Sequence, residues 1–170
     1  METSEFIQDE LERVKQGISR VITGLSPYEL MWRPGVESNS IGLILFHLAR
    51  SEDGFVQGRI LNQLQIWEVE KWYQKLNMSV SDTGSSYTPE QIITFPVLTL
   101  EDLMNYAEAV RVRTLQYLKG KNNADFDKII NMPRRGDTTI GAVFSLIVVH
   151  LAQHIGDIAY IRGMQRGLNK

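Results

Sequence analysis

The chain has 170 residues, of which 43% are hydrophobic and 22% are charged, and its formal net charge is −2 at pH 7. A chain of this length can bury one sizeable core, so we expect a single domain over residues 1–170. With a pI of about 5.9, the chain offers no basic surface for a phosphate backbone, and we expect no nucleic-acid partner. The chain has no cysteine, which excludes disulfides, thiolate nucleophiles and thiolate metal ligands.

Two features argue against a membrane protein. No uninterrupted apolar run reaches the roughly 18 to 20 residues that span a bilayer. The first residues, METSEFIQDELERVKQG, carry too many charges for a secretory signal. We therefore expect a cytoplasmic protein with no membrane partner.

The first part of the chain predicts two long helices joined by a short one. Apolar residues at three- and four-residue steps predict a helix over residues 4–25. In the segment SPYEL, Ser26 is a helix cap and predicts a short helical turn. A second long helix begins near Ser40, and Gly54 and Gly58 are weak points towards its end.

The rest of the chain predicts a long irregular crossover and two more long helices. The crossover contains aromatic-rich helical turns, a Ser/Gly/Thr loop and a helix cap at Thr88, and such long connections are often functional lids. The third long helix follows a cap at Thr99 and stops at Gly120. The fourth runs over residues 140–162 and ends at Gly163. With no strand-like alternation, these elements predict an all-α protein built as a four-helix bundle.

Two of the three histidines are four residues apart in the segment VVHLAQHIGDIAYIRG. This spacing places His150 and His154 on one face of the fourth predicted helix, where they continue its inward apolar stripe. His47 lies between Ile44 and Leu48 on the second long helix, so it faces inward or along a seam between helices. Three imidazoles from two helices can hold one metal ion and leave positions open, as in catalytic zinc sites. The alternative is that all three are ordinary core residues with hydrogen-bonding partners.

Two segments carry a resemblance to a known family. VESNSIGLILFHLARSEDGFVQGRI and VVHLAQHIGDIAYIRGMQRG resemble the signature segments of the DinB-like superfamily, the YfiT-type helical metalloproteins. The resemblance extends over nearly the whole chain and implies a four-helix bundle with a metal ion held by His47, His150 and His154. Zn²⁺ and Ni²⁺ are the expected ions, since imidazole ligands do not choose among the late first-row metals. The family is also compatible with a homodimer formed through an exposed helix face.

The resemblance implies several activities. Some relatives transfer low-molecular-weight thiols to electrophiles, and others are described as metal hydrolases. We expect transfer of an external thiol to a small-molecule electrophile, because the chain has no cysteine of its own and a metal ion can lower the pKa of a bound thiol or water. A metal-dependent hydrolase, or a module that binds a metal or a small molecule without turnover, remains an alternative.

One position departs from the family pattern. Many relatives have an amide three residues after the second histidine of the pair, whereas this chain has Asp157. We take Asp157 as the candidate catalytic residue: its carboxylate can be a fourth metal ligand, an acceptor for an imidazole N–H, or a general base for metal-bound water. The alternative is that Asp157 has no functional role and forms an ion pair with a nearby arginine such as Arg162.

Four further charged residues lie on the second long helix or just after it. Glu52 and Asp53 turn away from the face of His47, so we expect them to contact solvent or another subunit. Arg50 and Arg59 offer cations for an acidic substrate, although single arginines on helices are mostly surface residues. The RRGD run at residues 134–137 is interpreted as a turn.

Overall fold

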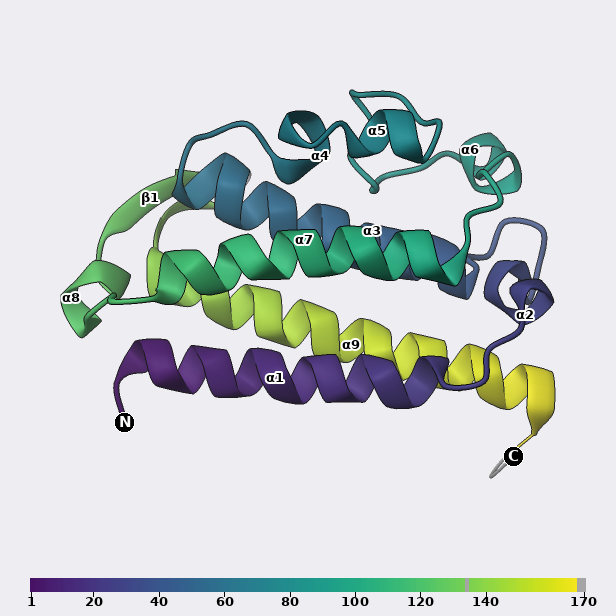
Figure 1. The fold of residues 1–170 in the computed structure, drawn as a ribbon, viewed down its shortest axis with the longest axis horizontal. Helices are drawn as coiled ribbons and strands as arrows, with labels where there is room; N and C mark the ends of the chain where they lie inside the picture. Colours follow the sequence, from purple (N-terminus) through teal and green to yellow (C-terminus); the bar gives the residue numbers. More distant parts are fainter. Residues whose placement is uncertain (134, 168–170) are drawn as a thin grey trace.

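Four long helices dominate the computed structural model, which describes residues 1–133 and 135–167. They are α1 (Thr3–Ile22), α3 (Ile41–Asp53), α7 (Leu100–Leu118) and α9 (Ile140–Arg166), and they run along the longest axis of the molecule (Figure 1). Helix α1 packs against α9, and α3 packs against both α7 and α9. The protein is therefore mostly helical, as predicted.

Several helices begin at short polar residues, and the caps predicted at Ser26, Thr88 and Thr99 are confirmed. The side-chain oxygens of Ser40, Thr99 and Thr139 each accept a hydrogen bond from the backbone N–H three residues further on. Ser26 completes a capping box at the start of the short helix α2 (Pro27–Met31). These bonds satisfy N–H groups that the first turn of a helix leaves unpaired, which is why short polar residues mark the helix starts.

The crossover between α3 and α7 contains short helical segments that lie along one side of these two helices (Figure 1). They are η1 (Gly54–Ile60), α4 (Ile66–Val69), α5 (Trp72–Lys75) and α6 (Pro89–Ile93). Segment η1 continues α3 as a π-helix at the glycines that predicted a weak helix. Such π-helical turns are rare and occur frequently at functional sites.

A short helix and a β-hairpin connect α7 to α9. They are α8 (Asn123–Phe126), β1 (Ile129–Met132) and β2 (Gly136–Thr139), and the two strands pair antiparallel. The expectation of no strands was wrong, because strands of four residues are too short to show a clear alternating pattern. Within the RRGD run, Asp137 accepts a hydrogen bond from the side chain of Asn131, and Arg134 lies outside the described residues.

Helix α9 extends beyond its predicted end at Gly163. Gly163 remains helical, and a glycine inside a helix costs only about 1 kcal/mol relative to alanine. The helix stops at Gly167, whose φ of 80° suits glycine. The last turn is held by an ion pair between Arg166 and Glu29 of α2, so contacts outside the helix stabilise the extra residues.

By length and composition, α9 meets the criteria for a helix that crosses a membrane. This was not predicted, because polar residues such as His150 and His154 keep every uninterrupted apolar run in α9 short. Core helices of helical proteins satisfy the same criteria. In this fold α9 packs against α1 and α3 and buries Val143, Phe144 and Ile147.

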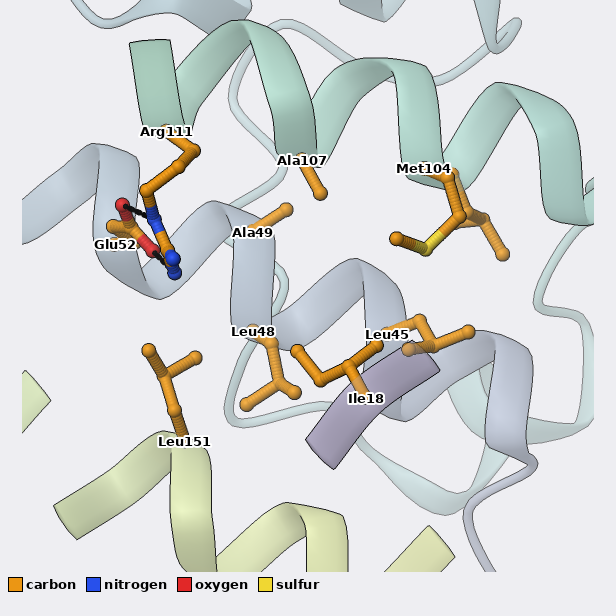
Figure 2. A pocket seen from close by; sticks show the side chains of 10 residues that line it. Ile18, Leu45, Leu48, Ala49, Glu52, Met104, Ala107, Arg111 and Leu151 are labelled. Atoms are coloured by element: carbon orange, nitrogen blue, oxygen red, sulfur yellow. Dashed lines mark hydrogen bonds and ion pairs between the residues drawn. The ribbon is translucent and has the colours of Figure 1, made fainter. Parts of the chain in front are cut away.

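Glu52 is buried in the protein, which corrects the expectation of a solvent or subunit contact. Its carboxylate accepts hydrogen bonds from Nε and Nη2 of Arg111 on α7 at 2.9 and 2.8 Å. Figure 2 shows this ion pair beside a small cavity of about 40 Å³ that is otherwise lined by apolar side chains such as Leu48 and Leu151. The position was mispredicted because the side of α3 that faces away from His47 is covered by α7 rather than by water.

Asp53 is also buried, and it attaches the crossover to α3. Its carboxylate accepts hydrogen bonds from the backbone N–H groups of Ile66 and Trp67, from the hydroxyl of Tyr106 and from Arg50. Desolvation raises the pKa of Asp53, whereas the two backbone donors act in the opposite direction. Arg50 is buried too and lies over the ring of Trp67, so it is not the surface residue that was expected.

Candidate metal centre

The three histidines meet where α3, α9 and the crossover come together. One ring nitrogen from each of His47, His150 and His154 lies within 4.8 Å of the other two. The Nε2 atoms of His47 and His150 are 2.9 Å apart. The structure therefore brings together the three residues that the sequence analysis singled out, two from α9 and one from α3.

The ring of His47 is oriented by the crossover. Its Nδ1 donates a hydrogen bond to the carbonyl oxygen of Gly84 at 2.7 Å. A carbonyl oxygen only accepts, so Nδ1 carries the proton and the lone pair of the neutral ring is on Nε2, the atom that faces His150. Contacts of this kind fix the tautomer of metal-binding histidines in many sites.

Glycine is required at position 84. Its φ is +69°, and a Cβ atom there would lie 2.8 Å from both Cβ and Cγ of Arg50. Residues with a side chain rarely adopt this conformation, and no real Cβ atom tolerates such a contact. Arg50 also donates hydrogen bonds to the carbonyl oxygen of Asp82, which holds the loop in place. Sequence reasoning missed Gly84, and a glycine within a Ser/Thr-rich loop was the only signal.

Asp157 contacts His154 from the far side of its ring. Its Oδ2 lies 2.8 Å from Nδ1 of His154, and its side chain is 59% exposed. The prediction that Asp157 lies on the buried stripe was wrong, because a helical stripe is buried only where another element covers it. Arg162 does not pair with Asp157 and instead donates hydrogen bonds to the carbonyl oxygens of Val21 and Thr23.

The histidine rings are half-buried, so they lie at the edge of the core rather than inside it. Desolvation is the main cause that lowers the pKa of His150 to about 4, and the charges of His154, His47 and Arg135 act in the same direction. Desolvation also lowers the pKa of His47, against the effect of its bond to Gly84. Both rings are therefore neutral at pH 7, which is the protonation state that binds metal ions.

The residues of the cluster fit a divalent late first-row cation. Such ions prefer imidazole nitrogen, and three protein ligands leave coordination positions for water or substrate. On two of the rings, Nδ1 is occupied by Gly84 or Asp157, so Nε2 is the nitrogen available for a cation. This arrangement of ligands with outer hydrogen-bonding partners is typical of protein metal sites.

One cavity is lined by the cluster, and a second, larger cavity shares Ser85 and Ser86 with it. The smaller has a volume of about 270 Å³ and is lined by His47 and His154 together with both apolar and polar side chains. The larger has a volume of about 810 Å³ and follows α3 into η1. Its walls include Ser51, which lies one helical turn after His47. The cluster therefore lies where small molecules can reach it from solvent.

Sequence reasoning missed most of the walls of these cavities. The glycines of η1 were interpreted only as weak points of a helix, and the hairpin residues Met132 and Pro133 were given no role. Both features are brought to the site by tertiary contacts, since β1 and α9 each contact η1.

Comparison with known proteins places this architecture in a family. The model of the DinB superfamily matches residues 10–158. The fold is similar to a solved structure described as the crystal structure of the conserved protein of locus from Enterococcus faecalis, with a TM-score of 0.83 and 18% sequence identity. That match covers 96% of this chain and 97% of the other. No curated protein gives a match. The chain belongs to the DinB superfamily.

Proposed function

We propose that this protein is a metal-dependent enzyme that transfers an external low-molecular-weight thiol to a small electrophile. The observation that carries the proposal is the convergence of three imidazoles at the wall of a cavity open to small molecules, next to a second, larger cavity. In this account His47, His150 and His154 hold Zn²⁺ or Ni²⁺. The four long helices then correspond to the four-helix bundle of the superfamily.

The surrounding residues prepare the three imidazoles for this task. The carbonyl of Gly84 and the carboxylate of Asp157 keep protons on the outer nitrogens of His47 and His154, so that the inner nitrogens are free to bind a cation. When bound, a divalent cation supplies Lewis acidity, which lowers the pKa of a thiol or water at its open position. Asp157 is thus a positioning residue in this account, not a general base.

The cavity walls suit a thiol as the nucleophile. Among the described residues that line either cavity, none is an aspartate or glutamate that can take a proton from water. A thiol has a pKa of about 8.5 even when free, and a bound cation would lower it further, so a thiol needs no carboxylate base at this site. In the transfer, the sulfur forms a bond to the electrophilic carbon, the leaving group departs with its electron pair, and the thiol proton passes to solvent.

The smaller cavity suits the electrophile. Leu43, Ile44 and Ile92 give it apolar walls beside His47. Tyr87 also lines it, and the hydroxyl of Tyr87 is bonded to Asp82, which fixes the ring as part of the wall. A small apolar electrophile bound here lies directly against the histidine cluster, as transfer requires.

The test is a transfer assay on metal-loaded protein with 1-chloro-2,4-dinitrobenzene and a series of low-molecular-weight thiols, with mass-spectrometric detection of the thioether. The proposal expects product that depends on both protein and metal and is lost in His150→Ala. The matched control is Arg113→Ala, which removes an exposed arginine of α7 and leaves the rate unchanged. Saturable binding without product, or ester hydrolysis that needs no thiol, would overturn the assignment in favour of a binding module or a hydrolase.

A further inference from the structure

We propose that the larger cavity beside the histidine cluster binds a carboxylate-bearing polar molecule and that Arg59 selects its charge. The inference rests on the proposed function, because it names the substrate class of the same site: the thiol that enters this cavity is an acidic one. Three observations support it: the position of the cavity, the chemistry of its walls and the charges around it.

The cavity lies within reach of the cluster. Ser51 in its wall follows His47 by four residues on α3, and the Cβ atoms of such residues are about 5–6 Å apart on a helix. Ser85 and Ser86 separate the larger cavity from the smaller one, because both residues belong to the walls of each. A molecule in the larger cavity can therefore extend its reactive atom to the histidines while its other end stays along η1.

The walls are polar and carry no negative charge. Hydroxyl and amide groups come from α3, the crossover and the loop before α6, namely Ser51, Gln63, Gln65, Thr83, Ser85 and Ser86. None of the described lining residues is acidic. A cavity with many hydrogen-bonding groups and no carboxylate favours a ligand that is polar and anionic, since an anion there meets donors without meeting a like charge.

The glycines of the π-helix give the cavity its depth. A Cβ atom at Gly58 would meet only the side chain of Gln65, at an ordinary contact distance of 3.5 Å. At Gly54 the nearest atom is also from Gln65, at 3.9 Å. Neither glycine is required by close packing, and both line the cavity. Their lack of side chains therefore leaves room for a ligand against the backbone of η1.

Of the two arginines that line the cavity, one is already paired with a carboxylate and, within the residues that the structure describes, the other is not. Arg50 lines it, but its guanidinium is paired with the buried Asp53. Arg59 is exposed and forms no ion pair with any residue in the described part of the chain. The charge of Arg135, on the hairpin, reaches His150 closely enough to affect its pKa. A carboxylate in the cavity can thus form a bidentate pair with Arg59, the geometry for which guanidinium is suited.

The two cavities differ in the polarity of their walls, as the two substrates of the proposed transfer differ in polarity. The smaller has Leu43, Ile44 and Ile92 in its walls beside a few polar groups, whereas the larger has more hydroxyl and amide side chains and is bordered by Arg59. We therefore assign the electrophile to the smaller cavity and the carboxylate-bearing thiol to the larger one.

The test uses S-methylglutathione, which carries two carboxylates and no free thiol, and its dimethyl ester, which keeps the amino group but has no carboxylate, as matched probes. Both are titrated into metal-loaded protein and followed by backbone amide shifts. The inference expects the acid to bind at least about tenfold more tightly than the ester and to shift the amides of Gly54, Gly58 and Ser85. Arg59→Ala should remove this preference, while Arg113→Ala should keep it.

A second variant fills the cavity instead of removing the charge. Gly58→Leu should abolish binding of the acid while circular dichroism shows an intact helical fold. Equal affinity for acid and ester, or an unchanged preference in Arg59→Ala, would overturn the inference. Arg59 is exposed, so Arg59→Ala should fold normally and gives this test even if Gly58→Leu does not fold. Metal content is measured on the same samples. A protein that binds metal but does not prefer the acid contradicts this inference alone, whereas a protein that binds no metal contradicts the proposed function. The His150→Ala variant should lose metal and transfer activity but retain the preference for the acid.

Discussion

His47 and Gly84 are joined by a hydrogen bond of 2.7 Å from the imidazole Nδ1 to the backbone carbonyl. The two residues are 37 positions apart, and the bond connects α3 to the irregular crossover. The orientation of one proposed metal ligand therefore depends on the folding of a loop. That loop is in turn attached to α3 through Arg50 and Asp82.

A substitution at Gly84 should damage both stability and metal binding. Gly84→Ala has to adopt a positive φ, which costs about 1–2 kcal/mol, and its Cβ would press against Arg50 at 2.8 Å, which adds about 1–3 kcal/mol. Displacement of the carbonyl should weaken metal affinity about 10–100-fold. Urea unfolding and competition with a chelating dye measure the two effects.

Gly120→Ala is the matched control for this prediction. Gly120 also has a positive φ, of +75°, but nothing lies within 4 Å of its Cβ position. It should show the conformational cost alone, with unchanged metal affinity. If both variants lose the same stability and the same affinity, the contact between Gly84 and Arg50 has no special role.

Removal of the Asp157 carboxylate should weaken the metal site without unfolding the protein. Asp157→Ala leaves Nδ1 of His154 without its partner at 2.8 Å, and we expect metal affinity to fall about 10–100-fold. Arg162→Ala serves as the comparison, because Arg162 contacts backbone carbonyls rather than Asp157, and its metal affinity should match wild type. Wild-type affinity in Asp157→Ala would exclude the positioning role.

The ion pair between Glu52 and Arg111 should be costly to break from one side. Glu52→Leu leaves a buried guanidinium without its carboxylate and should lower the free energy of unfolding by about 3–5 kcal/mol. The double variant Glu52→Leu/Arg111→Met removes both charges and should recover most of that loss, although the backbone carbonyl of Leu11 loses its donor. Urea unfolding of wild type, single and double variants measures this. A double variant no more stable than the single one would contradict the account.

The stability of the metal-free protein should fall as the pH drops from about 6.5 towards 4. The pKa of His150 is about 4 in the folded protein and about 6.5 in an unfolded chain. In this interval the unfolded chain binds protons that the folded protein does not, so acidification favours unfolding. His150→Gln should flatten the pH dependence of the free energy of unfolding measured in urea. A variant with the same pH slope as wild type would show that His150 is not responsible.

The local signals in the sequence were sufficient for the helices and the histidine cluster. Ser40, Thr99 and Thr139 cap their helices through contacts within four residues, so their role is visible in a short stretch of sequence. The pairing of His150 with His154 follows from helical periodicity alone. The inward position of His47 on the second long helix connected it with this pair, and the family resemblance then supported the same three residues.

The remaining features depend on what lies opposite each residue. Glu52 and Asp53 are buried because α7 and the crossover cover them, and no local pattern reveals which neighbour covers a helix face. Gly84 and the walls of the larger cavity come from segments that meet only after folding. Asp157 was placed on a buried stripe that is not covered at that position.

The central claim is that the three histidines hold one metal ion. It is tested most directly by elemental analysis of tag-free protein. Wild type is compared with the variants His150→Ala and His154→Ala and with a surface control, Arg113→Ala, which leaves all three histidines in place. The account predicts one equivalent of zinc or nickel in wild type and in the Arg113→Ala control, and none in either histidine variant. Metal retained in both histidine variants, or a wild-type protein that binds no metal even after reconstitution, would contradict it.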